Sequence, residues 1–117
     1  MKGEQYPAPG NSYEANFGEF AWRLDFDADG KTVTFSPIDA KQEDLAGEPG
    51  SQTVTYTAVP IRDGIFMVYW QEARGTTVTH VQDFESQRVH TNITTRDDTF
   101  INLPGTFTPV NRAMAKG

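Results

Sequence analysis

Two side chains that can exchange protons lie on either side of one short turn of this sequence. Glu72 directly precedes the turn 73–75, and His80 lies five positions beyond it. Carboxyl and imidazole groups are common general acids and bases in enzymes, and they also anchor the polar ends of bound molecules. A carboxyl group in an apolar wall has a raised pKa, which suits proton transfer near neutral pH. The two residues therefore predict either an acid–base site or a binding site with two anchors.

The segment before the turn determines where Glu72 points. Residues 65–72 are rich in aromatic and branched side chains, which is typical of a strand. Because side chains alternate between the faces of a strand, one face carries Phe66, Val68, Trp70 and Glu72. This face is mostly large and apolar, so we expect it to point inward. Two interpretations of Glu72 stay open: it pairs with Arg74 in water at the strand end, or it lies in the wall of a pocket.

The position of His80 favours binding over direct catalysis. Glu72 and His80 lie at different distances from the turn, so they cannot face each other across the hairpin. We expect His80 opposite residues 66–68, with any link to Glu72 running through a ligand or water. This geometry suits two anchors along one molecule better than a hydrogen-bonded dyad. Neither face of residues 77–83 is plainly apolar, so an exposed or internally satisfied histidine stays open as the alternative.

Alternation with a period of two recurs along most of the chain, and a helical period does not. It predicts an all-β protein with eight strands, near residues 12–17, 20–26, 33–35, 53–59, 65–72, 76–83, 88–95 and 100–108. Short loops of about two to five residues make neighbouring strands antiparallel, and eight such strands close into an up-and-down barrel. A two-sheet sandwich is the alternative, although only residues 39–51 could supply its long crossing connection.

The prediction is thus a single domain over 1–117, with an ordered barrel from about 12 to 110 and flexible tails. The acidic segment 39–51, rich in Gly and Pro, is expected to cross one barrel end as a mobile flap that controls access. Phe20, Trp22, Leu24 and Phe26 are expected to face inward with the apolar face of residues 66–70. For a ligand site, the predicted walls are Phe20, Trp22, Tyr56 and Trp70, and the predicted anchors are Tyr13, Glu72, His80 and Asn92.

Composition narrows the classes of function. The net charge of −6 argues against nucleic acid and against anionic membranes as partners. The chain has no cysteine and only two histidines outside any ligand-like cluster, so we expect no metal and no cofactor. The N-terminal residues lack the apolar core of a secretory signal, and no apolar run approaches membrane-spanning length, so a cytoplasmic location is expected. The oligomeric state is left open, with a homodimer among the possibilities.

Several motifs together resemble the MoaF (molybdenum cofactor biosynthesis protein F) family of small calycin-like, lipocalin-like barrels. They are Gly18-Glu19-Phe20-Ala21-Trp22-Arg23-Leu24, Tyr56-Thr57-Ala58-Val59, Phe66-Met67-Val68-Tyr69-Trp70-Gln71-Glu72, His80-Val81-Gln82-Asp83-Phe84 and Thr91-Asn92-Ile93-Thr94. The resemblance runs from about Tyr13 to Val110 and implies a calycin-like barrel. The sequence itself contains no Gly-rich phosphate loop and no basic cluster, so it does not indicate a pterin or nucleotide phosphate site.

The hairpin is also similar to that of the phenolic acid decarboxylases, another lipocalin-like barrel. Their Trp-x-Glu-x-x-Gly-Thr pattern falls on Trp70, Glu72, Gly75 and Thr76. The resemblance implies that Glu72 is the counterpart of their general acid and that Tyr13 matches a tyrosine that binds the substrate carboxylate. The second tyrosine of that pair falls on Ala15, and Glu48-Pro49-Gly50 stand where an arginine is expected. The carboxylate clamp is therefore incomplete.

Three functions compete on these grounds. The favoured one is a barrel that binds one small apolar or aromatic molecule, with little or no catalysis. The second is a lyase-like or decarboxylase-like enzyme that uses Glu72 as general acid or base with His80 as its partner. The third is a filled barrel that acts through its surface. A cavity lined by Glu72 would separate the first two from the third.

Overall fold

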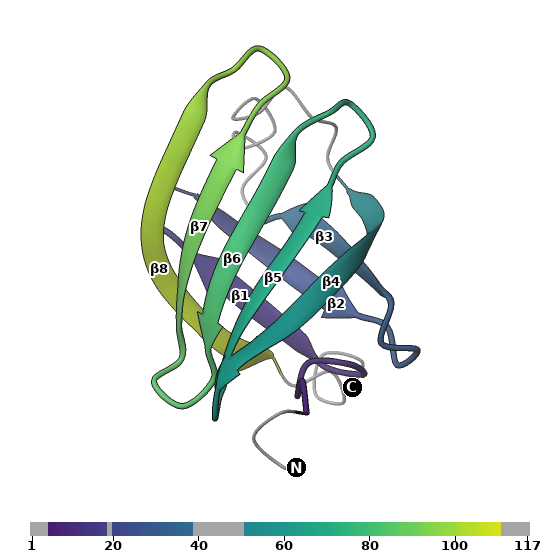
Figure 1. Ribbon diagram of the computed structural model, residues 1–117, viewed down its shortest axis with the longest axis vertical. Helices are drawn as coiled ribbons and strands as arrows, with labels where there is room; N and C mark the ends of the chain where they lie inside the picture. Colours follow the sequence, from purple (N-terminus) through teal and green to yellow (C-terminus); the bar gives the residue numbers. More distant parts are fainter. Residues whose placement is uncertain (1–4, 19, 39–50, 111–117) are drawn as a thin grey trace.

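The computed structural model describes residues 5–18, 20–38 and 51–110, which form one closed β-barrel (Figure 1). Its eight strands are β1 (Ser12–Asn16), β2 (Ala21–Phe26), β3 (Thr32–Pro37), β4 (Gln52–Arg62), β5 (Ile65–Gln71), β6 (Thr77–Asp83), β7 (Arg88–Thr94) and β8 (Phe100–Val110). Each strand pairs antiparallel with its neighbours in sequence, and β8 closes the barrel by pairing with β1. The predicted all-β, eight-stranded up-and-down barrel is confirmed, and the sandwich alternative is wrong.

Two parts of the predicted organisation fall partly or wholly outside this description. The described part of the 39–51 segment is Ser51 alone, so the mobile flap stays a prediction. Residues 1–4 and 111–117 are likewise outside it. Residues 5–11, in contrast, are described and lie against one end of the barrel, where Figure 1 draws them in purple below the strands.

Residues 5–11 help to fill the end of the barrel where the β2–β3, β4–β5 and β6–β7 turns lie. The amide of Phe26 donates to Asn11 and that of Gly10 donates to Phe26, both at 3.0 Å, so this segment extends the β2 hydrogen-bonding pattern. Ala8 is completely buried. The Tyr6 ring meets four aromatic rings with centroids 5.1–5.8 Å away: Phe26, Tyr56, Phe66 and Phe84. We call this aromatic half of the interior the closed end.

The predicted inward faces agree with the observed burial at most positions. Leu24, Phe26, Phe66, Val68 and Trp70 are all buried in the core. Trp22 is only partly buried and packs against the edge of this core. Phe20 is partly exposed and precedes β2, which begins at Ala21, so the inward orientation of Phe20 stays a prediction. The strand starts one residue later because Phe20 serves the β1–β2 turn, where its carbonyl accepts from the Phe17 amide at 2.7 Å.

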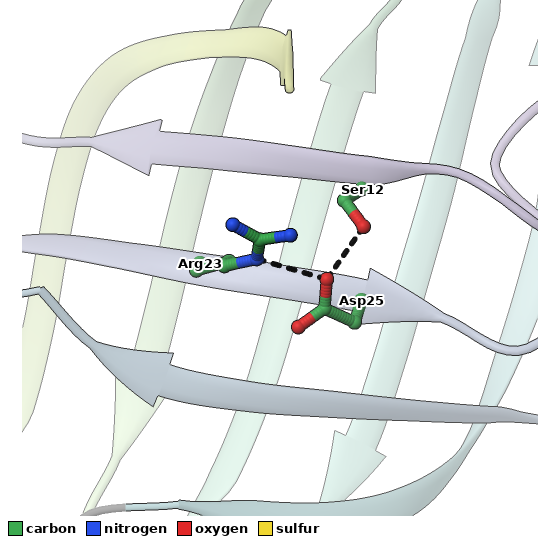
Figure 2. Close-up of polar contacts among 3 residues, drawn as sticks. All are labelled: Ser12, Arg23 and Asp25. Carbon is green, nitrogen blue, oxygen red and sulfur yellow. Dashed lines mark hydrogen bonds and ion pairs between the residues drawn. The ribbon is translucent and has the colours of Figure 1, made fainter. Parts of the chain in front are cut away.

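Polar side chains tie β1 to β2 on the other face of these strands. Ser12 lies opposite Asp25 in the register, and its hydroxyl donates to Asp25 Oδ1 at 2.5 Å (Figure 2). The same oxygen accepts a hydrogen bond from Arg23 Nε at 3.0 Å, so the Asp25 carboxylate bonds to one side chain of β1 and one of β2. Arg23 and Asp25 alternate with the inward Trp22 and Leu24, which is the polar-out pattern that the sequence predicted.

Candidate functional site

A cavity occupies the half of the barrel opposite the closed end, and we call it the open-end cavity. Its volume is about 50 Å³. Since a single water needs roughly 10–15 Å³, the cavity has room for a few waters or a very small ligand. Its apolar lining consists of Ala15, Phe17, Trp22, Leu24, Phe35, Trp70, Val78 and Ile93. Its polar lining consists of Glu72, Thr76, His80 and Thr91.

Glu72 reaches this cavity because the alternation of β5 continues into the hairpin turn. The Glu72 amide donates to the Thr76 carbonyl at 2.7 Å, and the Glu72 carbonyl accepts from the Gly75 amide at 2.9 Å. Gly75 has a φ of 97°, a left-handed conformation that glycine adopts without the strain of a side chain. The turn thus holds the Glu72 backbone from both sides and keeps its side chain on the inner face.

The Glu72 carboxylate is buried beside the indole of Trp70. Its side chain is 8% exposed, and Oε2 accepts a hydrogen bond from Trp70 Nε1 at 3.1 Å. Of the two interpretations of Glu72, its placement agrees with the pocket wall. A carboxylate has two oxygens with several lone pairs, so it can accept from an indole N–H and from other donors together.

His80 lies deeper in the same cavity, on β6. It stands opposite Val68 in the register, within the range predicted from the sequence, and it is 5% exposed. The rings of Trp70 and Phe17 meet its imidazole edge-on, with centroids 5.0 and 6.4 Å away. Burial lowers the pKa of His80 to about 3, so the ring is neutral at physiological pH. The interpretation of His80 as an exposed histidine is therefore wrong.

Strand register separates the two candidate anchors. The Glu72 backbone pairs with Thr76, four residues before His80 on the same side of β6. Four residues correspond to about 13 Å along a strand. Trp70 lies between them, since it donates to Glu72 and its ring packs on His80. The two residues therefore line one cavity at different levels, as expected from the sequence, and their role as anchors stays a prediction.

The polar wall near His80 includes a residue that the sequence analysis did not select. Thr91 on β7 lies opposite His80 and is completely buried. Its hydroxyl has no hydrogen-bond partner among the described residues, and the residue lines the cavity. A buried hydroxyl without a partner is unfavourable, so this position favours an occupant that can bond to it.

The remaining predicted site residues lie elsewhere. Tyr13 and Tyr56 belong to the closed end, where Tyr13 stacks on Phe107 at 4.6 Å and Tyr56 meets Phe26 edge-on at 5.4 Å. Asn92 points to the outer face because it alternates with the inward Thr91. There its Oδ1 accepts a hydrogen bond from Asn102 at 2.7 Å. Phe20 is not among the lining residues. The structure thus brings together Trp22, Trp70, Glu72 and His80 from the predicted set.

Buried neutral His80 should make the fold less stable in mild acid. Below its ordinary pKa of 6.5 the unfolded chain binds a proton that the folded chain does not bind until about pH 3. Stability from this residue is therefore lost as pH falls, by about 2 kcal/mol between pH 7 and pH 5. We expect the His80→Phe variant to lack this part of the pH dependence in urea unfolding measured at both values. The exposed His90 provides the control, since His90→Phe should keep the wild-type dependence; equal slopes for all three proteins would contradict the prediction.

Within the described ranges, no three His, Asp or Glu side chains gather closely enough to hold a metal ion. The same residues contain no helix long and apolar enough to cross a membrane.

The fold and the cavity define a class: a small calycin-like barrel, closed by eight antiparallel strands and hollow at one end. The chain belongs to the MoaF-like family, whose pattern it matches over residues 9–108. No curated protein matches the sequence. Among solved structures, it is similar to a beta-lactamase candidate from Burkholderia vietnamiensis, with a TM-score of 0.82 and 24% identity over 91% of this chain and 98% of the other. At that identity the likeness shows the fold alone.

Proposed function

We propose that this MoaF-like barrel binds one small, largely apolar molecule in the open-end cavity. The observation that carries the proposal is a small, mainly apolar cavity with polar groups at two depths along the barrel. Glu72 lies near the hairpin turn, and His80 and Thr91 lie further inside. Binding sites for small molecules combine apolar walls with a few placed polar groups in this way. The space of about 50 Å³ favours a molecule of only a few non-hydrogen atoms, because an engineered cavity that binds benzene measures roughly 150 Å³.

Both tryptophans of the chain line this cavity, which supplies a built-in reporter. We expect ligands that enter the cavity to change the intrinsic tryptophan fluorescence and to raise the melting temperature. The first experiment is to denature the purified protein and identify any released small molecule by mass spectrometry. The second is to titrate neutral compounds of a few non-hydrogen atoms while following fluorescence and melting temperature.

A matched pair of substitutions on β6 tests where such a molecule binds. Val78 lines the cavity, whereas Val81 is 41% exposed on the opposite face of the same strand. Val78→Phe should fill the hollow and abolish the response to ligand, and Val81→Phe should leave it unchanged. Val78→Ile is the milder filling variant if Val78→Phe unfolds. A ligand response that survives both filling substitutions would place the binding site elsewhere and overturn the proposal.

The second candidate function is a lyase-like enzyme with Glu72 as general acid or base. The burial of its carboxylate in the cavity wall favours this role, while its separation from His80 along the register argues against a direct carboxylate–imidazole dyad. Glu72→Gln keeps the shape and removes the ionisable group. Turnover of the identified ligand that disappears in Glu72→Gln, with binding retained, would favour the enzyme over the binding protein.

A further inference from the structure

A chain of buried hydrogen bonds runs from the closed end to the cavity. The Tyr6 hydroxyl donates to Gln82 Oε1 at 2.7 Å, and Gln82 Nε2 lies 3.1 Å from His80 Nδ1. Gln82 is completely buried, so both ends of its amide depend on these partners. Tyr6 belongs to the segment before β1, and the other two residues alternate on the inner face of β6.

The direction of this chain determines which nitrogen of His80 carries the proton. Burial raises the pKa of Tyr6, so its phenol stays a neutral O–H donor. When Gln82 accepts that bond through Oε1, only its NH2 group faces His80. Nδ1 must then accept, and the single proton of the neutral imidazole lies on Nε2. Since Nδ1 faces Gln82 toward the closed end, Nε2–H is the donor that His80 can present to the cavity.

The charges around the cavity restrict what this donor can bind. No lysine or arginine stands among the described residues that line it, and its ionisable members are the carboxyl of Glu72 and the neutral ring of His80. An anion placed there would lose its hydration without gaining an opposite charge from the described lining residues, which is strongly unfavourable. A neutral acceptor would lose much less, and it would satisfy the donor of His80 and the hydroxyl of Thr91 together.

We propose that the cavity selects uncharged molecules that carry a hydrogen-bond-accepting oxygen, such as a carbonyl, and receives this oxygen between His80 Nε2–H and the Thr91 hydroxyl. The inference rests on the proposed binding function and narrows it to one chemical class. Tyr6 and Gln82 act as positioning residues, because they hold the imidazole in the donating form without reaching the ligand.

The tautomer can be tested without any ligand. Nitrogen-15 NMR of the imidazole distinguishes protonation at Nε2 from protonation at Nδ1, and we expect Nε2–H alone in the wild-type protein. Tyr6→Phe removes the hydroxyl that orients the amide, so the Gln82 side chain can turn over and the Nδ1–H form should appear. Tyr56→Phe is the matched control, because the Tyr56 hydroxyl is buried in the same core but has no hydrogen-bond partner among the described residues. Protonation at Nδ1 in the wild type would overturn the inference.

Three probes of four non-hydrogen atoms each test the ligand class: acetone, isobutene and acetate. Acetone should bind about fivefold to tenfold more tightly than isobutene, as one net hydrogen bond predicts, and acetate should not bind measurably. Tyr6→Phe should reduce the preference for acetone, while Tyr56→Phe should keep it. Isobutene or acetate binding as tightly as acetone would overturn this inference and leave the binding function standing. Failure of all three to bind would instead count against the binding function itself.

Discussion

Replacing Phe26 by Ala should lower the free energy of unfolding by about 3–5 kcal/mol, the range measured for large buried aromatic residues. Phe26 is completely buried, and its ring meets those of Tyr6, Tyr13 and Tyr56 with centroids 5.4–5.9 Å away. Because the ring is completely buried against these three large side chains, its removal leaves a hole among them. Urea unfolding followed by far-ultraviolet circular dichroism measures the loss.

Trp22→Ala provides the comparison on the same strand. Trp22 is larger than Phe26 but only partly buried, and it borders space that is already open. We therefore expect Trp22→Ala to lower the free energy of unfolding by less than half as much as Phe26→Ala. Equal losses for the two variants would mean that the open-end cavity is as tightly filled as the closed end, which would also weaken the proposed binding function.

Gly105→Ala should destabilise the barrel by about 2–3 kcal/mol, because no room exists for a methyl group at this position. A Cβ there would lie 2.4 Å from the backbone oxygen of Asn16 and 2.6 Å from the Phe17 ring. The backbone oxygen belongs to the end of β1, so relief requires a shift of one strand against another. Thermal and urea unfolding of the variant give the magnitude.

Gly18→Ala separates this spatial effect from backbone strain. Gly18 has a φ of 97°, but among the described residues no atom beyond its chain neighbours lies within 4 Å of the position that an alanine methyl group would take. Gly18→Ala should lower the free energy of unfolding only by the strain of an alanine in the left-handed backbone conformation, about 1–2 kcal/mol. A Gly105→Ala variant as stable as the wild type would show that β8 can move away from β1 freely, contrary to the close approach seen here.

The sequence predicted the barrel well because strand alternation and short turns are local signals. The inner face of β5 followed directly from Phe66, Val68 and Trp70, and the same alternation carried Glu72 to the cavity wall. The pairing of His80 opposite Val68 also followed from counting outward from the turn. These inferences needed only the period of two and the position of the hairpin.

The contents of the site were harder to predict, because depth along the barrel axis depends on register around the whole sheet. Tyr13 and Tyr56 face inward as expected, yet they lie at the closed end rather than beside the cavity. On β6 and β7 the inner face itself carries polar groups, so polarity could not separate Thr91 from the outward Asn92. Tyr6 gave no periodic signal, since it lies among Pro and Gly residues before the first strand.

The pairing of the first strand with the last has a kinetic consequence. Ser12 lies opposite Val110, so the seam that completes the barrel joins the first and the last strand of the chain. Contacts between residues so distant in sequence carry a large loop-closure entropy, and folding rates fall as such contacts dominate. During synthesis, β1 and β8 cannot pair until β8 has left the ribosome, and until then β1 and β7 present unpaired edges. Closure of this seam should therefore be a late, cooperative step, and the open sheet before it should be the state of the protein most prone to aggregation.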